Sequence, residues 1–172
     1  MMSFYKYPKI YVEEGKLTRP QEAIFELADG TLCVVSKENL REISNYKRVF
    51  LKKIYETAYE DVIDLEQAKT KKAFITYSPK YDTYYLVEKN VKVGLMEIEG
   101  LKVFLGIDEG DTVREGNKIG YQVTRKYEVR NIVCIVEGTV VYIGTIFDEI
   151  QRYLIVTVGD ENVRKIRITY CK

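Results

Sequence analysis

The chain has 172 residues, enough for one domain or two small ones with a sizeable core. Its 27 Lys and Arg residues nearly balance 26 Asp and Glu residues, which argues against binding to a nucleic-acid backbone or an anionic membrane. It contains no histidine, which excludes Ser-His-Asp and Cys-His catalysis and most zinc sites. No apolar run approaches the length of a membrane span, and the first residues lack the apolar stretch of a signal peptide. We therefore expect a cytoplasmic protein.

The three cysteines, Cys33, Cys134 and Cys171, lie far apart, and none belongs to a Cys-x-x-Cys pair. A metal site or a redox motif is therefore not expected. Cys33 and Cys134 lie inside apolar, strand-like segments. In such segments a thiol usually packs as a small core side chain.

The first part of the chain predicts strands mixed with short helices. Apolar residues alternate on both sides of Asp29-Gly30, a pair suited to tight turns, so residues 22–36 predict a β-hairpin. Ser36 can then cap a helix over residues 37–47. Residues 48–63 are rich in β-branched and aromatic side chains and predict one long or two short strands.

The middle of the chain predicts one more helix and a second hairpin. Asp64 and Gln67 have the spacing of a capping box, which predicts a short helix starting there. Residues 73–89 predict two strands around a Ser-Pro-Lys-Tyr-Asp turn. From residue 91 onward the pattern is short strands and glycine turns. We therefore divide the chain into an N-terminal α+β part, 1–94, and a β domain, 95–172.

Tyr77, Tyr81, Tyr84 and Tyr85 cluster around Lys80. Such a cluster can be a stacking platform for single-stranded nucleic acid, or a hairpin whose rings cover a half-buried face. The balanced charge favours the second interpretation, and no nucleic-acid partner is expected.

One eight-residue phrase occurs twice, as EGLKVFLG at residues 99–106 and as EGTVVYIG at residues 137–144. The glycine in its second position allows a tight turn, and the alternating apolar residues after it predict a strand. The repeat predicts two similar β-units over residues 98–145, with Val103 and Val141 buried at corresponding positions.

The residues after the first copy strengthen this interpretation. They contain Gly110-Asp111-x-Val113-x-x-Gly116, which resembles the Gly-Asp-x-Val-x-x-Gly turn of the biotinyl/lipoyl carrier domains. Those domains are flattened β-barrels (barrel-sandwich hybrids) with two quasi-equivalent halves. The resemblance covers about residues 98–145 and implies such a barrel in the C-terminal part of a mainly β protein. It also implies a set of structural turn residues: Gly100, Gly110, Asp111, Gly116 and Gly138.

The second half of the predicted barrel departs from the family. Residues 145–158 contain no matching glycine turn and predict an added hairpin around Asp148-Glu149. The whole chain also resembles an uncharacterised archaeal family, with an N-terminal α+β part before a biotinyl/lipoyl-like barrel. That second resemblance implies an architecture and no activity.

Carrier domains attach biotin or lipoate to a lysine in an exposed hairpin. Counted forward from Gly116, Lys126 occupies this position; counted backward from Gly138, Tyr127 does, so the hairpin has one extra residue. Arg125 and Tyr127 also replace the Met residues that flank a biotinylated lysine, and Arg125 replaces the Asp that usually precedes a lipoylated one. These departures favour a bare lysine, and covalent biotin or lipoate on Lys126 is the alternative.

We therefore favour a non-catalytic binding or assembly module with a protein partner, no membrane contact, no metal and no prosthetic group. One alternative is a swinging-arm carrier acylated at Lys126, whose partner enzymes would supply all catalysis. The other is an enzyme with a carboxylate-based site, although no motif fixes two carboxylates together and most Asp and Glu residues are simply solvated.

Overall fold

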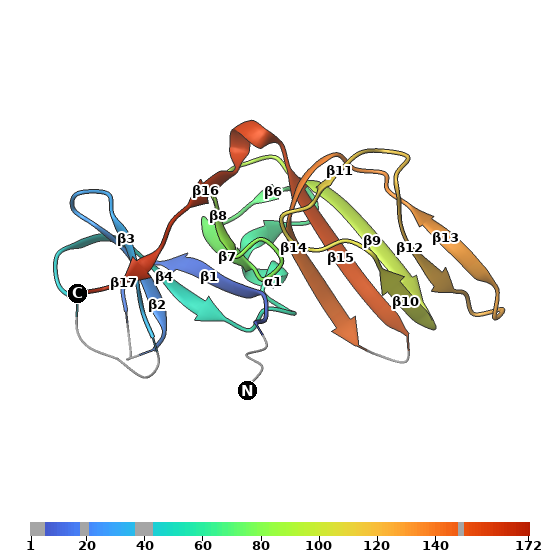
Figure 1. Cartoon of the computed structure of the whole chain (residues 1–172), viewed down its shortest axis with the longest axis horizontal. Helices are drawn as coiled ribbons and strands as arrows, with labels where there is room; N and C mark the ends of the chain where they lie inside the picture. The colour runs from blue at the N-terminus through green and yellow to red at the C-terminus, as the bar shows by residue number, and fades with distance from the viewer. Residues whose placement is uncertain (1–5, 18–20, 37–42, 148–149) are drawn as a thin grey trace.

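The computed structural model describes residues 6–17, 21–36, 43–147 and 150–172, and it is built almost entirely of strands (Figure 1). Within these ranges the α-helix is a single short one, α1 (Tyr59–Val62), and a 3₁₀ turn, η2, follows at Asp160–Asn162. The predicted mainly β character is confirmed.

The N-terminal part forms an eight-stranded sheet in the order β16-β8-β7-β1-β4-β2-β3-β17. Its strands are β1 (Lys9–Glu14), β2 (Ala23–Leu27), β3 (Leu32–Val35), β4 (Tyr46–Lys53), β7 (Phe74–Ser78), β8 (Thr83–Val87), β16 (Arg164–Ile166) and β17 (Thr169–Tyr170). The two outermost strands come from the end of the chain, which crosses back to this sheet (red in Figure 1). β16 pairs antiparallel with β8, and β17 pairs parallel with β3. The last strands of the chain thus belong to the N-terminal sheet. The predicted division at residues 94 and 95 stays a prediction.

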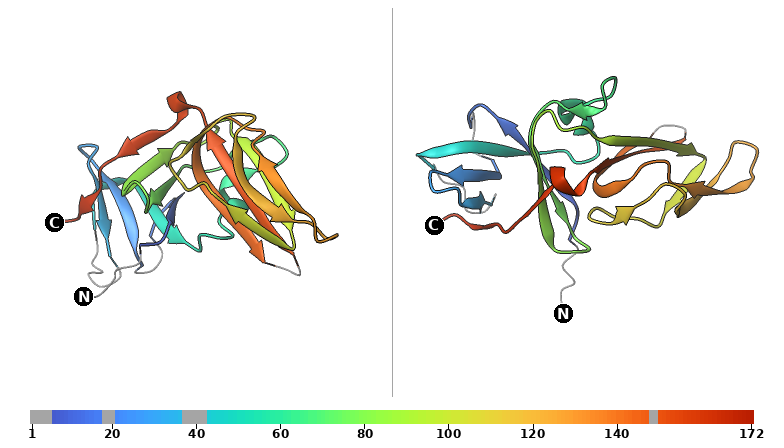
Figure 2. Two further views of the ribbon diagram at one scale, coloured as in Figure 1. Left: turned by 45° about the vertical axis from the view of Figure 1, so that its right-hand side comes forward. Right: turned by 90° about the horizontal axis from the view of Figure 1, so that it is seen from above.

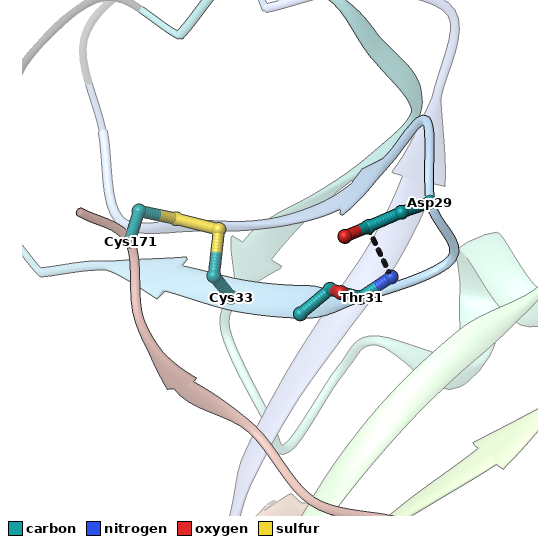
Figure 3. Close-up of a disulfide and its surroundings, with 4 residues drawn as sticks. All are labelled: Asp29, Thr31, Cys33 and Cys171. Carbon is teal, nitrogen blue, oxygen red and sulfur yellow. Dashed lines mark hydrogen bonds between the residues drawn. A yellow bond between two sulfur atoms is a disulfide. The ribbon is translucent and has the colours of Figure 1, made fainter.

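Both predicted hairpins of this part are confirmed. β2 and β3 pair around the Asp29-Gly30 turn, where Gly30 has φ 89° and Asp29 accepts a 2.9 Å hydrogen bond from the Thr31 N–H (Figure 3). β7 and β8 pair around the second predicted turn.

The predicted helices differ from the structure. Residues 37–42 lie outside the described ranges, but Tyr46 and Lys47, expected at the end of the first helix, belong to β4. β4 pairs with both β1 and β2, so sheet pairing outweighs local helix preference. Residues 48–63, expected as strands, include α1.

The helix predicted after Asp64 is also wrong. Its carboxylate does accept hydrogen bonds from the N–H groups of Glu66 and Gln67, both at 3.0 Å. Ala68 then adopts φ 51°, so the chain reverses and β5 (Ile63–Asp64) pairs with β6 (Lys69–Thr70). An Asp side chain makes the same local contacts in a turn as at a helix start, which explains the error.

The C-terminal part contains a four-stranded and a three-stranded sheet. The first has the order β11-β14-β15-β9 and the second has the order β10-β12-β13. Their strands are β9 (Gly94–Gly100), β10 (Lys102–Leu105), β11 (Thr112–Val113), β12 (Lys118–Val123), β13 (Val129–Val133), β14 (Gly138–Phe147) and β15 (Gln151–Val158). β14 and β15 form the predicted added hairpin, and its tip, Asp148-Glu149, lies outside the described residues.

The four-stranded sheet is the middle layer of the molecule. Leu154 and Val156 of β15 pack in one core with Ile10 of β1 and Phe74 of β7. Ile155 points to the opposite face of the same strand, in a second core shared with β10, β12 and β13. Because both of its faces are buried, β15 is nearly continuously apolar, as strands inside a three-layer arrangement are.

The two copies of the repeated phrase form β10 and β14 in different sheets. Val103 and Val141 are both buried, as predicted, but in different cores. The register of β14 shifts between Val140 and Tyr142, so Val140 shares the core of Val103, and Val141 joins the core against the N-terminal sheet. A β-bulge re-aims side chains in this way, and it makes the copies correspond with a one-residue offset.

A disulfide joins Cys33 of β3 to Cys171 beside β17, across 138 positions of sequence (Figure 3). Cys33 was expected as a free core thiol, and that expectation is wrong: the returning chain end brings Cys171 next to it. Cys134 is a free, buried cysteine, as predicted.

Candidate functional site

The predicted glycine turn packs against β14. The Gly110 N–H donates to the Val140 carbonyl at 2.7 Å, and the Val140 N–H donates to the Asp111 carbonyl at 2.8 Å. Val113 pairs with Gly138, which places that glycine beside the same turn. Further along the segment, the Gly116 N–H donates to the Cys134 carbonyl at 2.8 Å.

Gly100 lies apart from this turn, in β9 opposite Gln151. A Cβ there would stand 2.9 Å from the backbone oxygen of Val123, so a close backbone approach explains this glycine. Gly100 thus serves a different contact from the other predicted turn residues.

Asp111 fastens the turn to the β7–β8 hairpin. Its carboxylate accepts hydrogen bonds from Lys80 Nζ at 2.8 Å, from the Tyr81 hydroxyl at 2.5 Å and from the Asp108 N–H at 2.8 Å. Burial alone would raise the pKa of Asp111, but these donors outweigh it and hold the pKa below its ordinary value. Asp111 therefore links the turn to the β7–β8 hairpin as well as stabilising the turn itself.

Glu109 is a buried carboxylate that no local sequence pattern predicted as a site residue. Its side chain is 6% exposed and accepts a 2.8 Å hydrogen bond from the Tyr55 hydroxyl. Burial raises the pKa of Glu109, with the nearby Asp108 and Asp111 acting in the same direction. Its partner lies 54 positions away, so only the fold brings the pair together.

Glu109 and Asp111 each accept hydrogen bonds from protein donors. Among the residues that the structure describes, no group of three or more Cys, Asp or Glu side chains is placed to hold a metal ion. No helix in the described ranges is long and apolar enough to cross a bilayer.

Lys126 lies at the exposed tip of the β12–β13 hairpin. Figures 1 and 2 place this hairpin at the end of the molecule opposite the C-terminus. The Thr124 N–H donates to the Glu128 carbonyl and the Tyr127 N–H donates to the Thr124 carbonyl, both at 2.8 Å. Tyr127 adopts φ 62°, which makes the tip a three-residue loop closed by a left-handed residue. The extra residue noted in the sequence is thus taken up by the backbone of Tyr127, whose side chain is 81% exposed.

The three-stranded sheet presents apolar side chains on the face turned away from the core. The rings of Phe104 and Tyr121 stack with centroids 4.7 Å apart, and each residue is 43% exposed. Tyr121 pairs with Asn131, and Val129 and Val133 alternate with buried Ile132 along β13, so they share this face. Val129 is 69% exposed and Val133 is 49% exposed. The outer apolar face is defined by Phe104, Tyr121, Val129 and Val133.

The strands and hairpin that carry the outer apolar face are rich in positive charge. Residues 102–105 and 118–133 contain five basic residues and one acidic residue. The basic residues are Lys102, Lys118, Arg125, Lys126 and Arg130, and the acidic one is Glu128. Arg130 is bonded to Glu128 at 2.8 Å, which leaves the remaining cations uncompensated within these segments. The nearly balanced net charge of the whole chain does not reveal this local excess of positive charge.

Comparison with known proteins places the chain among uncharacterised archaeal proteins. Residues 5–161 match the family described as "Uncharacterized protein conserved in archaea (DUF2118)". The chain is similar to the uncharacterised protein MJ0859 of Methanocaldococcus jannaschii, with 22% identity over 168 residues, which cover 95% of this chain and 98% of that protein. Neither description includes an activity.

Proposed function

The chain belongs to this family of uncharacterised archaeal proteins, and we propose that it is a non-catalytic binding module that holds an acidic protein partner on the outer apolar face. The observation that carries the proposal is the stacked pair Phe104 and Tyr121, exposed together with Val129 and Val133 on one sheet face. Contiguous exposed apolar patches rimmed by polar residues are typical of protein interaction sites. Aromatic side chains are also the residues that most often anchor such interfaces.

The basic rim defines the chemistry of the partner. Uncompensated cations around an apolar centre favour a partner surface with acidic groups around an apolar centre, because complementary charge speeds association and fixes orientation. Single-stranded nucleic acid fits less well. One face of each ring is covered by the other ring, which reduces the open surface on which a base can stack.

A carrier-like barrel without a prosthetic group is part of the same proposal. Two facing sheets with a shared core, the Gly110-Asp111 turn against β14, and an exposed hairpin carrying Lys126 support this architecture. The three-residue loop and the flanking Arg125 and Tyr127 support a bare lysine. The exposed position of Lys126 keeps a second candidate open, a carrier acylated at that lysine, and the mass of the native protein separates the two.

We propose a cytoplasmic location for this module, with no membrane contact. The disulfide between Cys33 and Cys171 is compatible with that location, because intracellular proteins of hyperthermophilic archaea are rich in disulfides.

Photo-crosslinking in an archaeal host tests the proposed function. The photoreactive amino acid p-benzoylphenylalanine would replace Tyr121 in the outer apolar face or, as a matched control, the exposed Tyr7 of the N-terminal part. We expect a discrete adduct only from position 121, containing a protein with an acidic surface, and we expect Val129→Asp to abolish it. Equal crosslinking at both positions, an adduct that nuclease removes, or an adduct between two copies of this chain would each contradict the proposal.

A further inference from the structure

A second surface feature lies between the two parts of the chain, and it shares Lys118 with the basic residues near the outer apolar face. It is a hollow of about 610 Å³. Three segments line it: the β7–β8 hairpin, the stretch from Ile107 to Ile119, and the returning strand β16. Its polar lining includes Tyr81, Tyr85, Asp111, Lys118 and Lys165.

Tyr85 brings an unused hydrogen-bond donor to this hollow. The residue is 2% exposed, and its hydroxyl lies against Gly110, where a Cβ would stand only 2.6 Å from the oxygen. Within the described ranges this hydroxyl has no hydrogen-bond partner, although Tyr81 beside it is bonded to Asp111. The hydroxyl oxygen itself is accessible from the hollow, so it can donate a hydrogen bond to a molecule bound there.

The charges of the hollow are positive in sum. Lys118 and Lys165 line it from β12 and β16, and neither forms an ion pair with any residue in the described part of the chain. Asp111 is the carboxylate of the lining, and Lys80 and Tyr81 already occupy it. A negatively charged ligand would therefore meet two ammonium groups without displacing an existing ion pair.

Apolar side chains complete the lining. Ile107 contributes a partly buried side chain beside the ring of Tyr81, whereas the side chains of Val113 and Ile119 belong to the core. Pockets that combine apolar walls with a few convergent polar groups are the usual form of a small-molecule site, and they are frequent where two parts of a protein meet.

We propose that this hollow binds a small organic anion, a phosphate or carboxylate joined to an apolar or aromatic body. The anionic group lies between Lys118 and Lys165 and accepts the hydroxyl proton of Tyr85 in a hydrogen bond. The body packs on Ile107 and the Tyr81 ring. Because Lys165 belongs to β16, the site is complete only when the chain end is docked on β8.

Titration calorimetry with four probes tests this proposal: phenyl phosphate, benzoate, inorganic phosphate and uncharged benzyl alcohol. We expect saturable binding of phenyl phosphate or benzoate, weaker binding of inorganic phosphate, and none of benzyl alcohol. The stronger of the two aromatic anions identifies the anionic group. No saturable binding of either, or equal affinity for inorganic phosphate, would overturn the proposal.

Variants separate a built site from general charge attraction. Lys118→Gln with Lys165→Gln should weaken binding about tenfold or more, since two charge-assisted contacts are lost. Tyr85→Phe keeps the buried ring and should weaken binding by about threefold or more. The control, Lys89→Gln with Lys92→Gln, makes the same charge change at exposed lysines outside the hollow and should leave affinity unchanged. If both double-lysine variants lost the same affinity while their melting temperatures stayed unchanged, the proposed site would be contradicted.

Discussion

Gly110 lies directly against Tyr81: a Cβ on Gly110 would stand 2.5 Å from Cδ2 of the tyrosine ring. The same glycine has φ 95°, a conformation in which side chains other than that of glycine are strained. The turn that resembles the carrier family is therefore also the place where the C-terminal part rests on the β7–β8 hairpin.

This contact predicts different costs for two glycines in one motif. Gly116 has nearly the same φ, 94°, but a Cβ there would have nothing within 4 Å. Gly116→Ala should therefore lower the unfolding free energy only by the strain of a Cβ at positive φ, about 1 kcal/mol. Gly110→Ala should lower it clearly more, because the Tyr81 ring must also move. Urea unfolding of both variants measures the difference. Equal losses of unfolding free energy would show that the close contact is unimportant.

The hydroxyl of Tyr142 should stabilise the protein in addition to the packing of its ring. Its hydroxyl donates a 2.6 Å hydrogen bond to the Tyr55 carbonyl and accepts the Tyr59 N–H at 3.3 Å. Tyr142→Phe leaves these partly buried groups unpaired and should lower the unfolding free energy by about 1–3 kcal/mol. Tyr127→Phe, at a hydroxyl on an exposed loop, is the control and should change nothing. An unchanged unfolding free energy in the Tyr142→Phe variant would refute this role.

Glu109 should make stability depend on pH. Because burial raises its pKa in the folded protein, the folded state holds a proton that the unfolded chain has already released. The stabilisation is complete below the ordinary carboxyl pKa of 4.5 and is lost as pH rises through the raised folded value. Glu109→Gln does not titrate. The melting temperature of this variant should therefore rise relative to that of the wild type as the pH increases above 4.5. A difference that does not change with pH would contradict the prediction.

Reduction of the disulfide should destabilise the protein. A bridge that closes a long loop typically contributes about 2–4 kcal/mol, so dithiothreitol should lower the urea midpoint of the wild type. Cys171→Ser should show the lower midpoint with and without reductant, which separates loss of the bridge from other effects of the reagent. Equal midpoints for oxidised and reduced wild type would mean that strand pairing alone holds the chain end.

The modification state of Lys126 distinguishes the proposed binding module from the alternative, a carrier acylated at this lysine. We expect the protein isolated from its native host to have the mass of the bare chain, and Lys126→Ala to fold and melt like the wild type. Intact-mass spectrometry makes the measurement. A native protein heavier by one biotinyl or lipoyl group, with the increment absent from Lys126→Ala, would establish the carrier instead.

Local signals predicted much of this fold. The two N-terminal hairpins were recognised because turn residues such as Asp29-Gly30 act within a few positions of the chain. The helix expected after Asp64 failed for the same local reason, since its hydrogen bonds to Glu66 and Gln67 occur equally in a turn that joins two strands.

Contacts between distant residues were not predictable in this way. The bond between Cys33 and Cys171 requires the chain end to return to β3, and nothing in the residues near either cysteine encodes that path. Tyr55 with Glu109, and Tyr85 with Lys165, are likewise brought together by sheet order. The bulge at Val140–Tyr142 also shifted the two copies of the repeat by one residue, which alternation alone does not reveal.

The link between Cys33 and Cys171 makes a covalent ring of most of the polypeptide. A single peptide cut anywhere inside that ring opens it without releasing a fragment. The exposed tip at Arg125 and Lys126 is a natural place for trypsin to make such a cut. The nicked protein would run as one species on a non-reducing gel and as two after reduction. Damage at the hairpin would therefore leave the two halves of the protein attached to each other, and a reductant would decide whether they separate.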